Sequence, residues 1–422
     1  MSAAPHAAVT APSTTDGIRA AIAPTLERLR AGAAARDAER EHPFAEVREL
    51  ADAGILRFRV PAEDGGAGAS VREFAELIID LAAADSNVAQ ALRSGFLVAE
   101  SLATGNVTGR ARAQLVDRVL RGDLFSGTAN ETGGAAGSVR TTLTRDEHGL
   151  RIDGAKYYST GGLHAQWFSG TALDEQGRIV GFTVPTDREG VVRLDDFDAV
   201  GQRLTASGST LLQGVRVDPD ELGEPNAPKH HPHVSLAHLI LAATLAGIAQ
   251  AVRDDAVRVV REVARPIKHS TAQTAADDPY VREVTGRIAT AAFTARAQVV
   301  AAAEALDRHW ARESAGADPR DTEAGATDAD GRGGAGTGGE DTAVAAVVAV
   351  ASAYVGAGEQ ALRAAELLFD VGGGTLTGRE LGLDRHWRNA RTVANHNPRG
   401  WKSAAVGAWL LTGETPPANG LF

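Results

Sequence analysis

Apolar residues recur with two different spacings along this 422-residue chain, and the spacings divide it into three zones. From about residue 18 to 122 they recur every three or four positions, as in FAELIIDLAAADSNVAQALRSGFLVAESLA, which is typical of amphipathic helices. From about residue 233 to the end the same spacing returns in three long, Ala-rich runs. The pattern therefore predicts helical domains at 18–122 and 233–422.

The zone between them, residues 123–232, has another texture. Short runs of β-forming residues, such as GLRIDGAKYYSTGG, RIVGFTVP and STLLQGVRV, alternate with turns rich in Gly, Asp and Pro. This pattern predicts a small antiparallel β domain. The order helical, β, helical indicates an α+β fold, and no Gly-x-Gly-x-x-Gly follows a predicted strand, so we expect no nicotinamide-binding unit.

Local signals predict where several helices begin and end. A Gly-rich stretch, VPAEDGGAGAS, leads into a helix that should open near Ser70. Asp278 is expected to cap a helix whose first residue is Pro279, and the Gly pair at 372–373 should end the third long helix. Residues 1–17 and 313–341 contain few large apolar side chains, which predicts a disordered tail and a flexible insertion.

Composition narrows the function classes. The net charge of −11 and the pI of about 5.6 argue against a nucleic-acid partner, which favours a basic face. The absence of cysteine excludes disulfides, thiolate catalysis and Cys-ligated metal centres, and we predict no metal site. The N-terminus lacks the pattern of a signal peptide, and no apolar run reaches about 18 residues. We therefore expect a cytoplasmic protein without a membrane partner.

Several motifs occur in an order that resembles the acyl-CoA dehydrogenases. They are VPAEDGGAGAS, VGQRLTASGSTLLQGVRV, LFDVGGG and DRHWRNAR, and the resemblance spans roughly residues 18 to 415. It implies an N-terminal helical domain, a small central β domain and a C-terminal four-helix bundle. The stretches KYYSTGGLHAQW, DDPYVRE and LDRHWRNARTVANHNP resemble one branch more closely, the dibenzothiophene monooxygenase group of two-component flavin enzymes. That branch includes indole hydroxylases of natural-product pathways and amino-sugar N-oxygenases.

The segment after DRHWRNAR separates a dehydrogenase from an oxygenase. A dehydrogenase needs a carboxylate base above the flavin, but this chain has His396 and Asn397 where many relatives carry Tyr-Glu. Glu366 is an alternative base, although its sequence context favours a solvated helix face. An oxygenase instead needs hydrogen bonds to a flavin C4a-hydroperoxide, and the resemblance assigns that role to His396, which could also give the peroxide a proton.

The resemblance also implies flavin contacts in the β domain and at the bundle end. Ser159 would lie at the reactive edge of the ring, Asn130 would bond its pyrimidine edge, and Trp167 would stack near it. A cationic side chain beside Gly-rich backbone suits a phosphate, so the flavin tail is assigned to Arg282, Gly373 and Arg379. In DRHWRNAR, we expect His386 to pack within its helix and Arg388 and Arg391 to anchor the segment by ion pairs.

The substrate side departs from the sulfur-oxidising relatives. They carry a His in the helix after ADSNVAQALRS, where this chain has Gly95, followed by Phe96. We expect the lost imidazole to open volume and to weaken the case for dibenzothiophene, so that an indole-type aromatic becomes the favoured substrate. The pocket is predicted between Gly95, Phe96 and His396.

These observations predict a two-component flavin-dependent monooxygenase that hydroxylates an indole-type heterocycle, with S-oxidation of a thiophene as a second possibility. An NAD(P)H-dependent flavin reductase, as a transient partner, would supply reduced FMN or FAD, and O2 would be the co-substrate. The resemblance further implies a homotetramer built as a dimer of dimers. The alternatives are an acyl-CoA dehydrogenase, an amino-sugar N-oxygenase and a flavoprotein scaffold without turnover.

Overall fold

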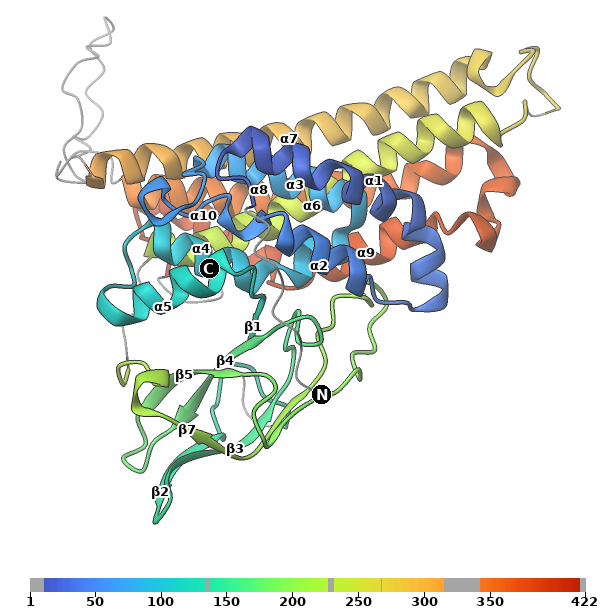
Figure 1. Ribbon diagram of the computed structural model, residues 1–422. Coiled ribbons are helices and arrows are strands. Elements are labelled where there is room, and N and C mark those ends of the chain that lie inside the picture. The colour runs from blue at the N-terminus through green and yellow to red at the C-terminus, as the bar shows by residue number, and fades with distance from the viewer. Residues whose placement is uncertain (1–10, 134–136, 227–230, 267, 315–341, 418–422) are drawn as a thin grey trace, which may run out of the picture.

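A computed structural model describes residues 11–133, 137–226, 231–266, 268–314 and 342–417 of the chain. The first ten residues of the predicted tail and nearly all of the predicted insertion lie outside the described residues. Figure 1 shows a layer of helices above a β domain, with the two parts joined along one side.

The N-terminal part is helical, as predicted, and its first helix begins at Thr15. Its helices are α1 (Thr15–Glu39), α2 (Phe44–Asp52), α3 (Val71–Ala91), α4 (Arg93–Ala103) and α5 (Gly109–Leu120), with 3₁₀ turns at Ile55–Arg57 and Ala62–Asp64. Ser70 caps α3 in a reciprocal arrangement with Glu73, which confirms the predicted start. The α3 helix is broken at Asp85, whose backbone has φ −155° and ψ 111°.

The β domain holds one seven-stranded sheet. Its strands are β1 (Phe125–Gly127), β2 (Thr142–Asp146), β3 (Gly149–Lys156), β4 (Trp167–Leu173), β5 (Ile179–Pro185), β6 (Val191–Arg193) and β7 (Thr210–Val217). Their order is β1-β4-β2-β3-β7-β6, with β5 paired to β4. Four strand pairings are antiparallel, as predicted, whereas β1 and β2 both run parallel to β4. Such pairs join segments distant along the chain, so no hairpin signal marks them.

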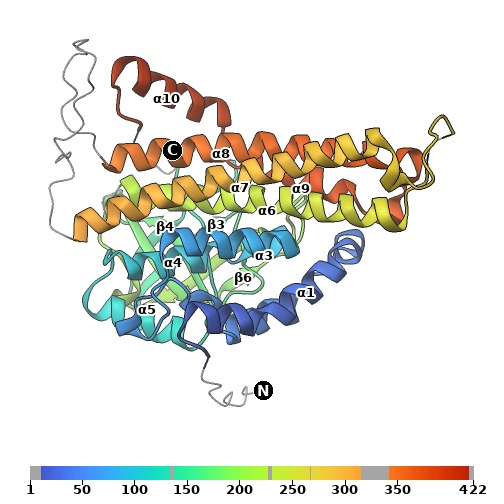
Figure 2. The ribbon, with the colours of Figure 1, turned by 90° about the horizontal axis from the view of Figure 1, so that it is seen from above.

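The C-terminal part is a bundle of long helices, seen from above in Figure 2. Its helices are α6 (His231–Glu262), α7 (Pro279–Ser314), α8 (Thr342–Leu367), α9 (Asp384–Ala394) and α10 (Arg399–Thr412). The carboxylate of Asp278 accepts from the backbone N–H of Tyr280 at 2.9 Å, so the predicted start of α7 is confirmed. The α8 helix ends earlier than predicted, and 3₁₀ turns follow at Leu368–Val371, Gly373–Thr377 and Arg379–Leu381.

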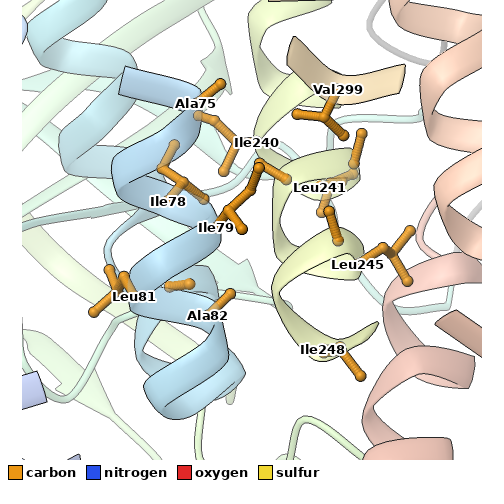
Figure 3. Packing of buried hydrophobic residues seen from close by; sticks show 14 of the residues in the cluster. Ala75, Ile78, Ile79, Leu81, Ala82, Ile240, Leu241, Leu245, Ile248 and Val299 are labelled. Atoms are coloured by element: carbon orange, nitrogen blue, oxygen red, sulfur yellow. The ribbon is translucent and has the colours of Figure 1, made fainter. Parts of the chain in front are cut away.

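Small residues let the bundle and the N-terminal helices approach closely. Figure 3 shows α3 against α6, with a short piece of α7 beside them, through the labelled side chains of Ala75, Ile78, Ile79, Leu81, Ala82, Ile240, Leu241, Leu245, Ile248 and Val299. A Cβ on Gly247 would collide with Ala82 and with the backbone of Ile79. Two helical stretches, Ser235–Glu262 and Thr342–Val371, are long and apolar enough to span a membrane by length and composition, and 83% and 50% of their most apolar windows are buried inside the protein.

Polar contacts fix the β domain against both helical parts. The backbone N–H of Gln202 donates to Asn389 of α9 at 2.6 Å, and its side-chain amide donates to Ser86 of α3 at 2.9 Å. Asn87, next to the break in α3, accepts from the backbone N–H of Leu204 at 3.2 Å. The break therefore exposes polar groups that hold the β domain at the end of α9.

Candidate active site

The first half of α9 is anchored by ion pairs. Arg385 and His386 both contact one carboxylate, that of Asp255 in α6, at 2.7 Å. Arg388 pairs with Asp37 of α1 and, at 2.7 Å, with Asp384. The predicted anchoring by Arg388 is confirmed. His386 has the structural role expected of it, but its partner lies on α6 and not within its own helix. No ion pair joins Arg391 to a described residue, so its anchoring role stays a prediction.

The loop that carries His396 follows directly, between α9 and α10. It is held by Tyr354, a fully buried residue of α8. The tyrosine hydroxyl donates to the carbonyl oxygen of Val393 at 3.0 Å and accepts from the backbone N–H of Asn397 at 3.2 Å. Asn397 is itself buried. One side chain of the bundle thus sets the backbone on both sides of His396.

The imidazole of His396 has an open side to solvent, while protein atoms crowd the remainder of the ring. This crowding and the positive charge of nearby Arg93 lower the pKa of His396 well below its ordinary value, although a hydrogen bond with the Asn397 side chain opposes the shift. The ring is therefore neutral at pH 7. A neutral imidazole offers one N–H for a hydrogen bond but lacks the second proton of an imidazolium. This state favours the predicted hydrogen bond to the peroxide over the predicted transfer of a proton to it.

The groups near His396 are basic. Arg93 and Arg399 both act electrostatically on the Tyr354 hydroxyl, and the Lys402 ammonium lies 5.7 Å from the centre of the tyrosine ring. Glu366, the alternative base, is exposed and pairs with Arg363 at 2.6 Å. It occupies the solvated helix face that its sequence context indicates. Within the described part of the chain, no carboxylate contacts the His396 ring.

The β domain brings Asn130 and Ser159 to neighbouring loops. The backbone N–H of Tyr157 donates to the carbonyl oxygen of Asn130 at 3.0 Å. Asn130 is exposed, and the next residue, Glu131, forms a buried pair with Lys156 at 2.6 Å that holds this loop in place. Within the parts of the chain that the structure describes, no residue hydrogen-bonds the Asn130 side-chain amide, and its backbone is anchored.

Ser159 is placed differently. Its side chain is buried, with 1% exposure for the residue, and its hydroxyl accepts from Thr210 at 2.8 Å. Its neighbour Tyr158 is 51% exposed and has a left-handed backbone with φ 61°, a rare conformation for an aromatic residue. The surface that this loop offers to a planar ligand is thus the ring of Tyr158. The role of Ser159 at a flavin stays a prediction.

Trp167 is tied to the helical part. Its indole N–H donates to Asp123 at 2.9 Å, and the guanidinium carbon of Arg118 lies 3.4 Å from the ring centre. These contacts occupy one face and the polar edge of the indole. Trp167 therefore links α5 to the sheet. Its predicted stacking on a flavin stays a prediction.

The β-domain loop after Tyr158 meets the helical part at the junction of α3 and α4. A Cβ on Gly161, which has φ +77°, would collide with the carbonyl oxygen of Ala91. Glycine is needed here because both the backbone conformation and the close approach exclude a side chain. The loop after Tyr158 therefore lies against the residues that immediately precede Arg93.

The residues assigned to the flavin tail lie in the segments around the start of α7. Arg282 is exposed and donates to Asp277 at 3.0 Å and to the carbonyl oxygen of Ala276 at 2.7 Å. Gly373 has φ +64° and open space where a Cβ would stand, and Arg379 is exposed. Exposed cations and accessible backbone suit a phosphate, and these assignments stay predictions.

The packing around Gly95 corrects one expectation. A Cβ on Gly95 would lie 2.8 Å from a methyl carbon of Leu56, so Leu56 already fills the volume that a missing imidazole was expected to open. Phe96 is fully buried and packs edge-to-face on Phe74 at 5.2 Å. Both residues face the helical core.

Comparisons with known proteins agree with this geometry. The family described as "Acyl-CoA dehydrogenase, N-terminal domain" matches residues 16–123. Dibenzothiophene monooxygenase of Rhodococcus erythropolis is 30% identical over 408 residues, which cover 92% of this chain and 92% of that protein. The chain belongs to this family, the flavin-dependent monooxygenases with the acyl-CoA dehydrogenase fold.

Two further relatives point the same way. A probable FMNH2-dependent monooxygenase of Pseudomonas putida, SfnC, is 29% identical over 389 residues, or 90% of this chain and 91% of that protein. The structure of TdsC from Paenibacillus sp. A11-2 with FMN and indole covers 96% of this chain and 99% of its own, with 25% identity and a TM-score of 0.81. The predicted fold is confirmed, and this monooxygenase is an oxidoreductase of the two-component class that uses reduced flavin and O2.

The donor set of this monooxygenase fits a flavin. The exposed amide of Asn130 and the exposed ring of Tyr158 lie on the β domain, the imidazole of His396 lies on the loop after α9, and the exposed Arg282 and Arg379 suit a phosphate. Sequence reasoning missed Tyr158, Tyr354 and Arg93. An aromatic pair before Ser-Thr-Gly-Gly is a usable signal for Tyr158, whereas Tyr354 lies some forty residues from its loop and carries none.

Proposed function

We propose that this monooxygenase transfers one oxygen atom from O2 to an electron-rich aromatic heterocycle, with indole-type hydroxylation favoured over S-oxidation of a thiophene. The bound flavin would supply the reactive oxygen as a C4a-hydroperoxide. The observation that carries the proposal is the loop after α9, where an open-sided, neutral His396 stands in place of a carboxylate. The indole in the TdsC complex supports the choice of ring system.

His396 would act as a hydrogen-bond donor to the oxygen that is transferred, with its ring set by Asn397 and the loop set by Tyr354. A neutral donor suits this task because it stabilises a peroxide oxygen without driving its early loss as hydrogen peroxide. If negative charge develops on that oxygen, it raises the imidazole pKa and strengthens the bond. Ser159 and Asn130 would contribute from the β domain.

The reductant would come from a separate NAD(P)H-dependent flavin reductase, a transient partner in the cytoplasm. FMN is favoured over FAD by the names of the relatives, and amino-sugar N-oxygenation stays an alternative because solved nitrososynthases share the fold. A homotetramer would cover the exposed apolar side chains of α10, among which Trp401 is 78% and Leu411 is 86% exposed. Light scattering of the purified chain measures that assembly.

The direct test uses ¹⁸O2, NADH, FMN and an unrelated flavin reductase, with indole, benzothiophene and dibenzothiophene as substrates. We expect ¹⁸O in the product of indole or of a thiophene, and no reduction of enzyme-bound flavin by acyl-CoA thioesters. Flavin reduction by a thioester without any reductase would instead establish the dehydrogenase alternative and refute the proposal.

A further inference from the structure

Arg93 is a positive charge without a counter-ion. It is the first residue of α4, its side chain is partly buried, and its Nε atom is buried without a hydrogen-bond partner. No ion pair or hydrogen bond joins it to any residue in the described parts of the chain. Burial lowers the pKa of Arg93 to about 10, so the guanidinium is still charged at neutral pH.

Several other partly or fully buried arginines of this protein have polar partners. Many pair with carboxylates, namely Arg36 with Asp85, Arg59 with Glu100, Arg112 with Asp64, Arg188 with Glu221 and Arg385 with Asp255. Arg193 instead donates to the carbonyl oxygens of Gly162 and Ala165. A desolvated charge that lacks a partner is costly to the fold. The stability of the fold therefore does not explain why a charged side chain lies at position 93.

The surroundings of Arg93 strengthen the positive field. Arg93 acts on the imidazole of His396 and on the hydroxyl of Tyr354, and Arg399 acts on the same hydroxyl. Lys402 lies over the ring of Tyr354. Three cationic side chains, those of Arg93, Arg399 and Lys402, thus lie near one buried tyrosine, beside the loop that the proposed function makes catalytic.

We propose that Arg93 binds an acidic group of the substrate, so that this monooxygenase acts on an aromatic heterocycle that carries a carboxylate or a similar oxyanion. A guanidinium matches such a group with two parallel N–H···O bonds and holds its plane. Arg93 is then a specificity-determining residue, and the acid group orients the ring beside His396. The inference rests on the proposed oxygenase function and names its substrate class.

The test measures binding, with oxidised flavin present, so that no turnover is needed. Isothermal titration calorimetry would compare indole-3-carboxylate with indole, and benzothiophene-2-carboxylate with benzothiophene. We expect the wild type to bind the acids at least about 10-fold more tightly than the neutral rings, because charge-assisted hydrogen bonds contribute enough binding free energy for such a ratio. Equal binding of acid and neutral ring in both pairs would overturn the proposal.

Variants assign the effect to Arg93. Arg93→Gln should weaken acid binding about 10- to 100-fold and leave indole binding unchanged, whereas Arg93→Lys should restore part of the loss. Arg145→Gln removes the same charge from an exposed strand position and should change nothing. Thermal unfolding of each variant shows that it is folded. An equal loss of acid and neutral ligands in Arg93→Gln would contradict the assignment.

The phosphate of FMN is the other oxyanion that Arg93 could bind. If Arg93→Gln weakens FMN but not riboflavin, the guanidinium serves the flavin tail and the proposal is wrong. Unchanged binding of both flavins, together with loss of acid binding, supports it. The experiments distinguish this outcome from failure of the oxygenase function itself. In that case the products would contain no ¹⁸O, while the calorimetric preference for the acids would be unchanged.

Discussion

The two halves of the segment from Asp384 to Arg399 differ in whether their basic side chains pair with carboxylates. In the first half, Arg385, His386 and Arg388 all find carboxylates on α1, α6 or α9 itself. In the second half, His396 and Arg399 join Arg93 in a basic group to which no described carboxylate is paired. The paired half is a structural anchor, whereas we propose that the unpaired half binds a ligand. Ion pairing, rather than residue type, separates the two roles.

The anchor should respond most strongly to mutation. Asp255→Asn removes the partner that Arg385 and His386 share, and leaves buried polar groups uncompensated. We expect the free energy of unfolding to fall by about 3–5 kcal/mol, measured by urea denaturation. Asp254→Asn is the matched control, because that residue pairs only with Arg253 at the surface and should cost under about 0.5 kcal/mol. Similar losses in both variants would contradict the distinction.

A buried base in the β domain should make the fold sensitive to acid. His164 is 8% exposed, and burial together with nearby His42 lowers its pKa to about 4. Since the folded pKa lies below the unfolded value of about 6.5, the stability is fully present above pH 6.5 and is lost as the pH falls toward 4. We expect a loss on the order of 2–3 kcal/mol, and His164→Phe should flatten that part of the stability curve. An unchanged curve would show that His164 is not responsible.

Removal of one hydroxyl should loosen the catalytic loop with a smaller effect on the fold. Tyr354→Phe abolishes the bonds to Val393 and Asn397 but keeps the buried ring. The expected cost is about 1–2 kcal/mol of stability, together with faster hydrogen exchange at residues 395–399. Exchange in that loop at the wild-type rate would mean that Tyr354 does not set its backbone.

The smallest effect on stability is expected at Arg93 itself. Arg93→Gln removes a charge that has no partner, so the free energy of unfolding should change by less than about 0.5 kcal/mol or rise. The thermal midpoint, read beside that of Asp255→Asn, measures the contrast directly. A large loss of stability in Arg93→Gln would place Arg93 with the anchor rather than with the ligand side.

Local signals predicted much of the fold, and the limits have physical causes. Ser70 and Asp278 revealed helix starts because a cap and its helix are adjacent in sequence. The parallel pairing of β1 with β4 joins segments some forty residues apart and leaves no local trace. The zones and motifs were sufficient for the architecture, since periodicity and turn chemistry act over short distances.

The site was predicted only in part, for a related reason. The position of His396 followed from its place after the Arg-rich helix, but its neighbours Tyr354 and Arg93 come from other helices. Gly95 was interpreted as the position of a lost His, but Leu56 fills the space beside it. The residue of α4 that we propose to meet the ligand is Arg93. Which face of a helix meets a ligand depends on tertiary packing, and one sequence does not reveal it.

The central claim is that His396 holds the oxygen adduct of the flavin. Stopped-flow absorbance of the enzyme with reduced FMN, mixed with O2, tests it in the wild type and in His396→Ala, with His386→Ala as the anchor control. We predict a long-lived C4a adduct in the wild type that decays at least about 10-fold faster in His396→Ala, which loses one hydrogen bond to the adduct, while a folded His386→Ala retains the adduct. Direct return to oxidised flavin in the wild type, or equal lifetimes with and without His396, would contradict the account.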